Sequence, residues 1–479
     1  MQVLQVPSKP LTSNRLIVFM TLSFLLCITY LLTSFSIIPN TEQNTHSSTS
    51  SLHRLSSPTS INHIIFGIAS NRNSWSRRKN YVRLWWGPNE MRGCVFLESA
   101  SPDATDTDHG RDAESLPPTC VSEDTSRFRY THRNGLRSAV RVARVVSETV
   151  KLNHSDVRWF VFGDDDTVFF PENLAKTLSK YDHDLWYYIG TNSESYAQNK
   201  IFSFDMAFGG AGFAISYPLA KVLAKVFDSC LDRYPHLYGS DGRIHACLAE
   251  LGVSVTHEPG FHQMDIRGSM FGFLASHPLR PIISLHHSDA TEPIFPNKTT
   301  SIQALEHLFR SVSIDSQRVM QQTVCYDRWF YWTISVSWGY AVQIFQHNAY
   351  VVDAIRTQKT YVPWKKGGGV DELYNVDTLG YHHDPCRRPI VFYMHNVLSG
   401  KDGIITSTYR VMTSENCTFD RASPRKLEEI RVFSHKLELD NKQLQSPRRH
   451  CCDVLPSKAD TIMEIAIREC GYGELIFMH

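Results

Sequence analysis

An apolar run that ends in three consecutive aspartates constrains the fold of this chain more than any other feature. Residues 159–163 are apolar, and Asp164, Asp165 and Asp166 follow directly. Such a run is typical of a strand buried in a parallel sheet. Like charges side by side at its end are costly unless a cation or a ligand compensates them, and carboxylate oxygens suit Mg²⁺ or Mn²⁺. A solvated acidic turn, with Asp166 capping the next helix, is the alternative interpretation.

The segments around this run alternate between short strands and amphipathic helices. Residues 64–69 form the first predicted strand, and residues 134–152 place apolar side chains at helical spacing with arginines on the opposite face. Pro171 opens a further predicted helix, and another begins at Asp241. This alternation is typical of an α/β domain with a mainly parallel sheet.

The pattern changes after residue 291. Residues 332–338 alternate with period two, residues 390–394 form another apolar run, and three glycines at 367–369 interrupt the chain between them. Period-two alternation predicts β-strands. We therefore expect an α/β domain at residues 61–291 and a smaller β-rich domain at residues 292–479.

The N-terminal region predicts a membrane anchor. Residues 16–38 are almost wholly apolar and uncharged, which is long enough for one transmembrane helix, and Lys9 and Arg15 precede them. Basic residues are more frequent on the cytosolic side of a transmembrane helix, so Lys9 and Arg15 predict a cytosolic tail at residues 1–15 and a type II orientation. Residues 39–60 are rich in Ser, Thr and Asn and predict a flexible stem. A cleaved signal peptide is the alternative, but the apolar segment is longer than usual for one.

The cysteines are consistent with an oxidising lumen. Eleven are present, and all but Cys27 lie beyond the predicted anchor, so ten could form five disulfides of unknown connectivity. Cys94 and Cys120 bracket most of a polar loop at residues 98–125 and could staple it. The adjacent Cys451 and Cys452 are typical of a disulfide node rather than of a metal site.

Sequons and charge bear on the compartment and on partners. Three sequons, at Asn153, Asn297 and Asn416, fit a lumenal body. The formal net charge of +1 gives no indication of binding to nucleic acid or acidic lipid.

Two further segments could reach the edge of the sheet where the aspartate triplet falls, which is where ligands sit in open α/β sheets. Gly209 and Gly210 lie among small residues between two phenylalanines, a composition suited to close approach of the backbone to a ligand or to a structural turn. His262 follows the strand after the last helix and could be a third metal ligand or a structural histidine.

Other polar clusters have simpler interpretations. Arg78 and its basic neighbours follow the first strand and could contact phosphates, although at least two of these side chains are expected to be solvated surface residues. His286 and His287 with Asp289 suggest a second metal site, as do residues 382–384. We interpret both histidine pairs as structural hydrogen-bonding residues.

Taken in order, these segments resemble a known family. Residues 159–169, the glycine turn with residues 213–216 behind it, and the helix start at Ser240 and Asp241 resemble fringe-like family 31 glycosyltransferases over roughly residues 60–275. The resemblance is closer to plant fringe-related proteins that are grouped as a domain of unknown function. The segments that carry this closer likeness are residues 66–70, 83–86, 260–263, 284–289 and 293–296.

The resemblance implies a GT-A fold that binds a UDP-sugar donor through Mn²⁺ or Mg²⁺. It implies that Asp164, Asp166 and His262 ligate the metal. The residues implied to lie near the nucleotide are Asp164, Asp165, Ala69, Ser70, Arg78, Gly209 and Gly210.

Asp241 is implied to be the general base. An inverting transfer needs one carboxylate to deprotonate the acceptor hydroxyl while the metal neutralises the departing diphosphate. Asp241 could instead be a helix N-cap. The family has two acids where this chain has Ser240 and Asp241, which puts acceptor binding in doubt.

These observations lead to three hypotheses about function. The first is a Golgi type II membrane glycosyltransferase that moves a sugar from a UDP-sugar to a glycan or glycoprotein hydroxyl, with inversion and in β-1,3 linkage, the linkage coming only from the family. The second is a non-catalytic glycan-binding or scaffold protein on the same fold. The third is a metal-dependent hydrolase of nucleotide diphosphates. The donor sugar, the acceptor and the oligomeric state stay open.

Overall fold

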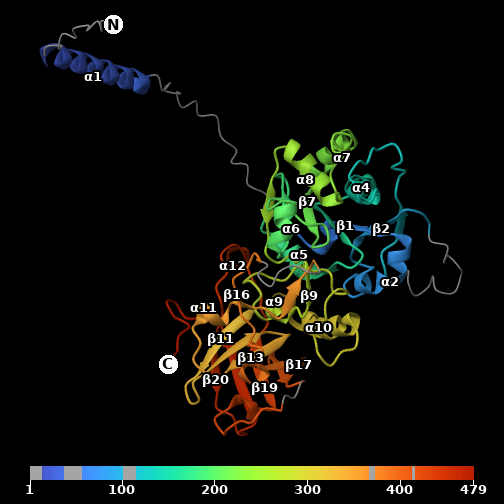
Figure 1. Ribbon diagram of the computed structural model, residues 1–479, viewed down its shortest axis with the longest axis vertical. Coiled ribbons are helices and arrows are strands. Elements are labelled where there is room, and N and C mark those ends of the chain that lie inside the picture. The colour runs from blue at the N-terminus through green and yellow to red at the C-terminus, as the bar shows by residue number, and fades with distance from the viewer. Residues whose placement is uncertain (1–12, 37–56, 101–114, 366–372, 413–415, 479) are drawn as a thin grey trace, which may run out of the picture. The chain divides into compact units, whose positions relative to one another are not determined.

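The computed structural model describes residues 13–36, 57–100, 115–365, 373–412 and 416–478. Most of the predicted tail and stem, part of the polar loop and the glycine triplet lie outside these residues. The chain separates into two units, Met1–Ser57 and Pro58–His479 (Figure 1). Helix α1 (Ser13–Ser36) belongs to the first unit. Among the helices that the structure describes, none meets the length and hydropathy needed to cross a membrane, so the predicted anchor is not confirmed.

A seven-stranded sheet forms the first half of the second unit, in the order β3-β2-β1-β4-β7-β6-β8. Parallel pairing predominates, and only β7 runs antiparallel to its neighbours β4 and β6. The prediction of a mainly parallel α/β sheet is therefore confirmed. The strands are β1 (Ile64–Ala69), β2 (Arg92–Leu97), β3 (Thr119–Val121), β4 (Trp159–Asp164), β6 (Tyr188–Gly190), β7 (Phe213–Ser216) and β8 (Val255–His257).

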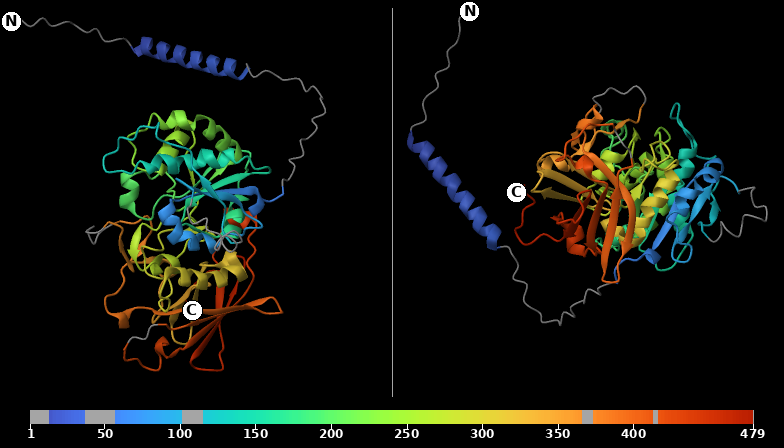
Figure 2. Two further views of the ribbon diagram at one scale, coloured as in Figure 1. Left: turned by 90° about the vertical axis from the view of Figure 1, so that its right-hand side faces the viewer. Right: turned by 90° about the horizontal axis from the view of Figure 1, so that it is seen from below.

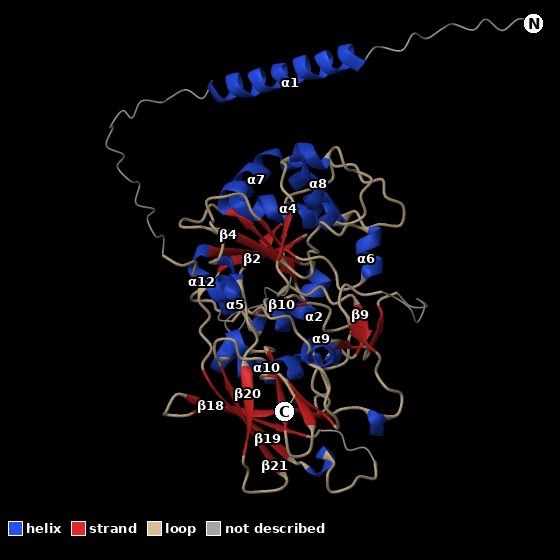
Figure 3. Cartoon of the chain, turned by 90° about the vertical axis from the view of Figure 1, so that its left-hand side faces the viewer, coloured by secondary structure: helices blue, strands red, loops and turns tan. Residues whose placement is uncertain are grey.

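Helices cover both faces of this sheet because its strands are apolar on both sides. Ile64 and Phe66 of β1 belong to one core cluster and Ile65 to the other, as the two-residue period of a strand requires. The face of Ile65 packs against α4 (Ser138–Lys151), α7 (Tyr217–Leu231) and α8 (Ser240–Glu250), which lie together in Figure 3. The face of Ile64 packs against α2 (Arg72–Arg83) and α5 (Pro171–Leu178). The predicted helices after Pro171 and at Asp241 are thus present.

An eight-stranded sheet forms the second half, in the order β11-β12-β13-β17-β18-β19-β21-β20. Its strands are drawn in the orange to red part of the colour range in Figure 2. All neighbours are antiparallel except β19 and β21. The strands are β11 (Gln322–Asp327), β12 (Trp332–Ser337), β13 (Ala341–Phe345), β17 (Ile390–Ser399), β18 (Ile404–Arg410), β19 (Glu429–His435), β20 (Cys451–Leu455) and β21 (Ile462–Arg468).

This second sheet curls until its two edge strands meet. A disulfide joins Cys325 of β11 to Cys452 of β20, and the Arg449 guanidinium donates to the carbonyl oxygen of Gln322 at 2.7 Å. Helix α10 (Ser301–Asp315) packs against β17. One hydrophobic cluster contains residues of both sheets, including Ile64 of β1 and Ile467 of β21, so the two halves share a core. The domain boundary at residue 291 stays a prediction.

Several short elements complete the second unit, and the pairing of β9 (Ile266–Gly268) with β15 (Tyr361–Pro363) connects its two halves. Strand β5 (Val168–Phe169) pairs with β10 (Ser284–Leu285). The other short elements are α6 (Tyr196–Ile201), α9 (Phe271–Ala275), α11 (Val351–Ala354), β14 (Thr357–Gln358), β16 (Thr378–Leu379) and α12 (Asn441–Gln445).

Five disulfides use all ten cysteines beyond the first unit, as predicted. Cys94–Cys120 is the predicted staple, and Cys451 and Cys452 bond to different partners, which makes them the predicted node. The bonds are Cys94–Cys120, Cys230–Cys247, Cys325–Cys452, Cys386–Cys417 and Cys451–Cys470.

Candidate active site

The aspartate triplet lies at the carboxyl end of β4, where the prediction placed it. Asp164 is the last residue of the strand, and the parallel register sets Ala69 of β1 beside it. The Asp164 N–H donates to Thr167 Oγ1 at 2.8 Å, and the Thr167 hydroxyl donates to the carbonyl oxygen of Gly210 at 2.8 Å. Thr167 therefore ties the acidic turn to the glycine turn.

Asp164, Asp166 and His286 converge at this edge. Their ligand atoms all lie within 4.8 Å of one another. His286 Nε2 is 3.2 Å from Asp166 Oδ1 and 3.9 Å from Asp164 Oδ2. Asp166 and His286 are buried, whereas Asp164 is partly exposed.

The residues of this group fit a divalent metal ion. Both carboxylate oxygens of Asp166 are buried without a well-formed hydrogen bond, and the charged groups near them are His286 and Arg78, at 3.2 and 3.3 Å from Oδ1. A buried carboxylate in that condition is costly unless a positive charge compensates it. Two carboxylates and one imidazole are ligands that suit Mn²⁺.

The pKa values of Asp164, Asp166 and His286 also indicate that a positive charge beside the two carboxylates is favourable. Although its side chain keeps some contact with solvent, the surrounding protein desolvates the Asp164 carboxylate and raises its pKa to about 7, against the influence of His286. Burial alone would raise the pKa of Asp166, but His286 and Arg78 hold it well below its ordinary value. Burial opposes protonation of His286, yet Asp166 and Asp164 raise its pKa to about 9. The two carboxylates therefore favour either an imidazolium or a metal ion beside them.

Asp165 and Arg78 form the adjoining wall. Asp165 Oδ2 accepts from the Ser70 hydroxyl at 2.6 Å, and Asp165 Oδ1 lies 3.3 Å from the Arg78 guanidinium. Arg78 also pairs with Asp166 at 3.3 Å and with Asp289. A cavity of about 520 Å³ opens here, and Ala69, Ser70, Arg78, the triplet and His286 are among the residues that line it.

Gly209 and Gly210 leave room for two side chains of the site. A Cβ atom on Gly210 would lie 2.1 Å from Cε1 of His286, and one on Gly209 would lie 2.6 Å from Oδ1 of Asp241. These separations are far below van der Waals contact, so only glycine permits both approaches.

Asp241 faces the glycine turn from the first turn of α8. It does not cap that helix, because the N-cap residue is Gly239 and makes no side-chain cap bond. Burial raises the pKa of Asp241, while the Gly209 N–H and the Ser240 hydroxyl oppose the rise. A small cavity of about 20 Å³ is lined by Asp241 and Asp164 together. A carboxylate with a raised pKa beside the metal-ligand group suits a general base.

His262 does not belong to the metal-ligand group, which corrects the prediction from the sequence. Its Nδ1 lies 3.0 Å from Glu194 Oε1, and its Nε2 lies 2.8 Å from Nε2 of the buried His277. Both ring nitrogens are therefore engaged away from the triplet.

His286, and not His262, is the histidine of the metal-ligand group. From the sequence we interpreted His286 and His287 as structural residues. Strand β10 pairs with β5, which directly follows the triplet, so residues 286 and 287 emerge beside it. The short apolar run before His286, residues 282–285, is the sequence signal that could have revealed this.

Trp364 is a neighbour of the site that sequence reasoning missed. Its ring stacks on that of His287 with centroids 4.2 Å apart, and the His287 ring lies 3.8 Å from that of His286. The Arg267 Nε–H donates to the carbonyl oxygen of Trp364 at 2.9 Å. The β9–β15 pairing thus brings a residue from the second half of the chain close to the metal-ligand group.

Comparison with known proteins gives one family and several glycosyltransferases. The family described as "Protein of unknown function, DUF604" matches residues 198–452. A mouse β-1,3-glucosyltransferase is 28% identical over 127 residues, which are 25% of this chain and 23% of that protein. The chain thus matches less than a quarter of the length of this curated relative.

The solved structures are more distant. One is the galactosyltransferase LgtC in complex with donor and acceptor sugar analogues, with 14% identity, a TM-score of 0.33, and coverage of 51% of this chain and 94% of that chain. Another is the mannosyltransferase PcManGT from Pyrobaculum calidifontis in complex with GDP-Man and Mn²⁺, with 14% identity, a TM-score of 0.27, and coverage of 46% and 62%. TM-scores this low carry no argument about this chain.

Proposed function

The chain belongs to the DUF604 family of proteins of unknown function, and on that premise we propose that it is a metal-dependent inverting glycosyltransferase. The donor would be a UDP-sugar and the acceptor a hydroxyl group of a glycan or glycoprotein. The observation that carries the proposal is the convergence of Asp164, Asp166 and His286 beside Asp241 at one edge of an α/β sheet. The name of the mouse relative supports a β-1,3 linkage.

The metal-ligand group and its wall would bind the donor. Asp164, Asp166 and His286 would hold Mn²⁺, which supplies the positive charge that a departing diphosphate needs. Arg78 and Ser70 line the same cavity and keep Asp165 oriented, so they would orient the nucleotide end of the donor.

Asp241 would act on the acceptor. Its carboxylate accepts the proton of the acceptor hydroxyl, whose oxygen attacks the anomeric carbon of the donor sugar as the bond to the diphosphate breaks on the opposite face. This geometry inverts the configuration at that carbon. The raised pKa of Asp241 brings it closer to the working pH, which strengthens it as a base.

The disulfides support a compartment for this reaction. Five bonds need an oxidising environment, as found in the secretory pathway. We place the catalytic part in the Golgi lumen, tethered by residues 16–38, and the tether is an inference from the sequence alone.

One substitution separates catalysis from folding. Asp241→Asn should bind a UDP-sugar with Mn²⁺ as wild type does, melt within a few degrees of it, and transfer sugar at least about a hundredfold more slowly. Asp232→Asn is the matched control, because it makes the same chemical change at an exposed residue. Radiolabelled UDP-sugars, glycan acceptors and product analysis measure the transfer.

Other outcomes would assign a different function. Wild-type turnover in Asp241→Asn would exclude it as the base. Release of UDP at the same rate with and without acceptor would indicate a hydrolase of nucleotide diphosphates. Binding of UDP that persists in chelator, or in Asp166→Ala, would contradict the metal site.

A further inference from the structure

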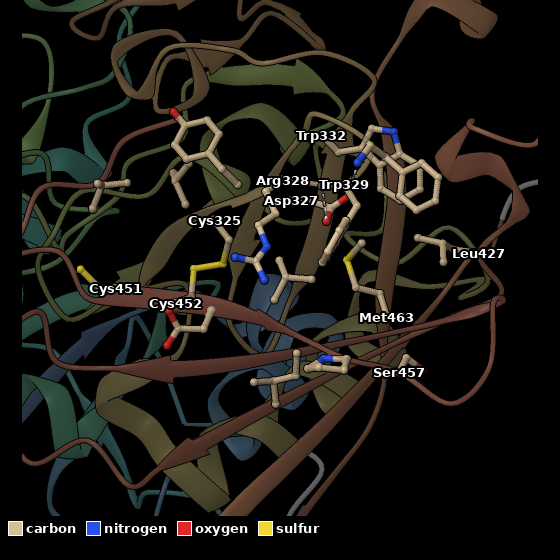
Figure 4. Close-up of a pocket in the computed structure, with 18 of the residues that line it drawn as sticks. Cys325, Asp327, Arg328, Trp329, Trp332, Leu427, Cys451, Cys452, Ser457 and Met463 are labelled. Carbon is tan, nitrogen blue, oxygen red and sulfur yellow. Dashed lines mark hydrogen bonds between the residues drawn. A yellow bond between two sulfur atoms is a disulfide. The ribbon is translucent and has the colours of Figure 1, made fainter. Parts of the chain in front are cut away.

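A second cavity lies in the eight-stranded sheet and shares no residue with the candidate active site. Its volume is about 700 Å³, and it opens where the edge strands β11 and β20 meet. Figure 4 shows Trp329 and Trp332 together on one side of it and the Cys325–Cys452 disulfide on another. We call it the hairpin cavity, after the turn between β11 and β12 that forms its aromatic side. Mouths of curled β-sheets are common places for ligands.

The aromatic side of the hairpin cavity is held in place but open. Phe330 stacks on Trp332 with ring centroids 4.6 Å apart, and the Lys426 ammonium lies 3.9 Å above the Phe330 ring. The Arg328 guanidinium lies 4.9 Å from the centroid of Trp329, whose side chain is nevertheless 73% exposed. Stacking and cation–π contacts thus fix the rings while one tryptophan presents its surface to solvent. The reaction proposed above uses none of these residues.

The charges around the hairpin cavity are nearly balanced. Arg468 pairs with Asp453 at 2.7 Å and with Glu474 at 2.8 Å. The charged residues that line the cavity are Asp327, Asp453, Asp460, Glu474, Arg328, Lys426 and Arg468. An anion such as a nucleotide, or an acidic lipid surface, would need an excess of positive charge, which these residues do not provide.

This chemistry selects an uncharged ligand that has both apolar faces and hydroxyl groups. Exposed aromatic faces pack against the C–H faces of a sugar ring, and carboxylates and guanidinium groups keep hydrogen-bonding capacity for hydroxyls after pairing with each other. We propose that the hairpin cavity binds an uncharged glycan. The choice of a glycan rests in part on the proposed function, whereas the aromatic side and the charge balance stand without it.

Such a site would act on the acceptor side of the reaction. A glycan held in the hairpin cavity is tethered to the protein, which raises the effective concentration of its reactive end at Asp241 when the chain is long enough to reach both sites. Long acceptors should therefore show a lower KM than short ones, and the difference should depend on Trp329.

Binding of short uncharged oligosaccharides to the full-length protein tests the proposal. Saturation-transfer NMR would detect binding, and calorimetric titration would measure it. Trp329→Ala should weaken binding at least about tenfold, because it removes the exposed ring, whereas Trp329→Phe should retain much of it. Trp186→Ala is the matched control, since Trp186 is also exposed, at 45%, and lies outside the cavity. The exposure of Trp329 means that its loss should leave the fold intact.

Several results would overturn the proposal. Absence of saturable binding to any oligosaccharide would do so, as would equal affinity in Trp329→Ala, or Trp329-dependent binding to phosphatidylserine vesicles in place of oligosaccharides. Measuring both sugar transfer and oligosaccharide binding with the wild-type protein separates this proposal from the first. If wild type transfers no sugar but still binds oligosaccharides through Trp329, only the proposed catalysis fails. If it transfers sugar but binds none, only the hairpin cavity fails.

Discussion

At the scale of single residues, the candidate active site depends on the space left by two missing side chains. Gly210 lies against the imidazole of His286, and Gly209 lies against the carboxylate of Asp241. One turn therefore positions both the proposed metal-ligand group and the proposed base.

Gly210→Ala should disturb His286, and with it the metal-ligand group, whereas Asp241 lies against Gly209. The new Cβ atom would lie 2.1 Å from the His286 ring, so the ring must move, and its movement should lower Mn²⁺ affinity at least about tenfold. Overpacking of this kind costs about 1–3 kcal/mol of stability, so the protein should still fold. Titration of Mn²⁺-dependent UDP binding measures the effect. Gly380→Ala is the control, because nothing lies within 4 Å of its added Cβ atom. Unchanged Mn²⁺ affinity in Gly210→Ala would remove His286 from the metal-ligand group.

The sequence predicts the acids of this site better than its histidine. Asp164, Asp165 and Asp166 follow a strand whose apolar residues alone predict that it is buried. Their place at the edge of the sheet therefore depends only on residues next to them in the sequence. The choice between His262 and His286 depends on which strand pairs with β5, and that pairing joins residues more than a hundred positions apart. The short run at residues 282–285 suggests a strand before His286, but it does not say which strand it pairs with.

At the scale of elements, the pairing of β9 with β15 links the two halves of the chain beside the site. Trp364 follows β15 and stacks on His287, the residue directly after His286. The stack should therefore restrain the position of His286 through its neighbour.

Trp364→Ala tests this restraint. An aromatic pair contributes about 0.5–1.5 kcal/mol, so its loss should weaken Mn²⁺-dependent UDP binding roughly two- to tenfold with little change in melting temperature. Trp364→Phe should restore most of the affinity, because it keeps an aromatic ring that can stack on His287. Trp329→Ala, in the hairpin cavity and away from this stack, should leave this affinity unchanged. If Trp364→Ala binds UDP as tightly as wild type, the stack has no role in the site.

The elements themselves were predictable where their periodicity is local. The strand at residues 64–69 and the helix within residues 134–152 appear as expected, and the latter begins at Ser138. The antiparallel direction of β7 and the position of β21 between β19 and β20 were not predictable, because they depend on the path of the chain between strands.

At the scale of the whole molecule, the bond between Cys325 and Cys452 closes the eight-stranded sheet. It encloses a loop with a sequence separation of 127, so its chain-entropy contribution to the free energy of unfolding is about 4–5 kcal/mol. The double variant Cys325→Ser with Cys452→Ser should lose about that much stability in denaturant unfolding. It should also weaken oligosaccharide binding, since the edges of the hairpin cavity would separate. Cys27→Ser, which removes the free cysteine, should change neither quantity. An unaltered unfolding midpoint in the double variant would show that hydrogen bonds alone hold the two edges.

The closed sheet also sets an order of events during synthesis. In this sheet β20 pairs with β21, so the edge of β11 that is not paired with β12 stays uncovered until both strands, which end at Arg468, have been made. At common elongation rates, the 127 positions between Cys325 and Cys452 take roughly 6 to 25 s to translate. During that interval a thiol and a bare strand edge are both exposed to other nascent chains. A product that stops before Arg468 would keep them exposed permanently, so it should be retained and degraded instead of exported as a shorter protein.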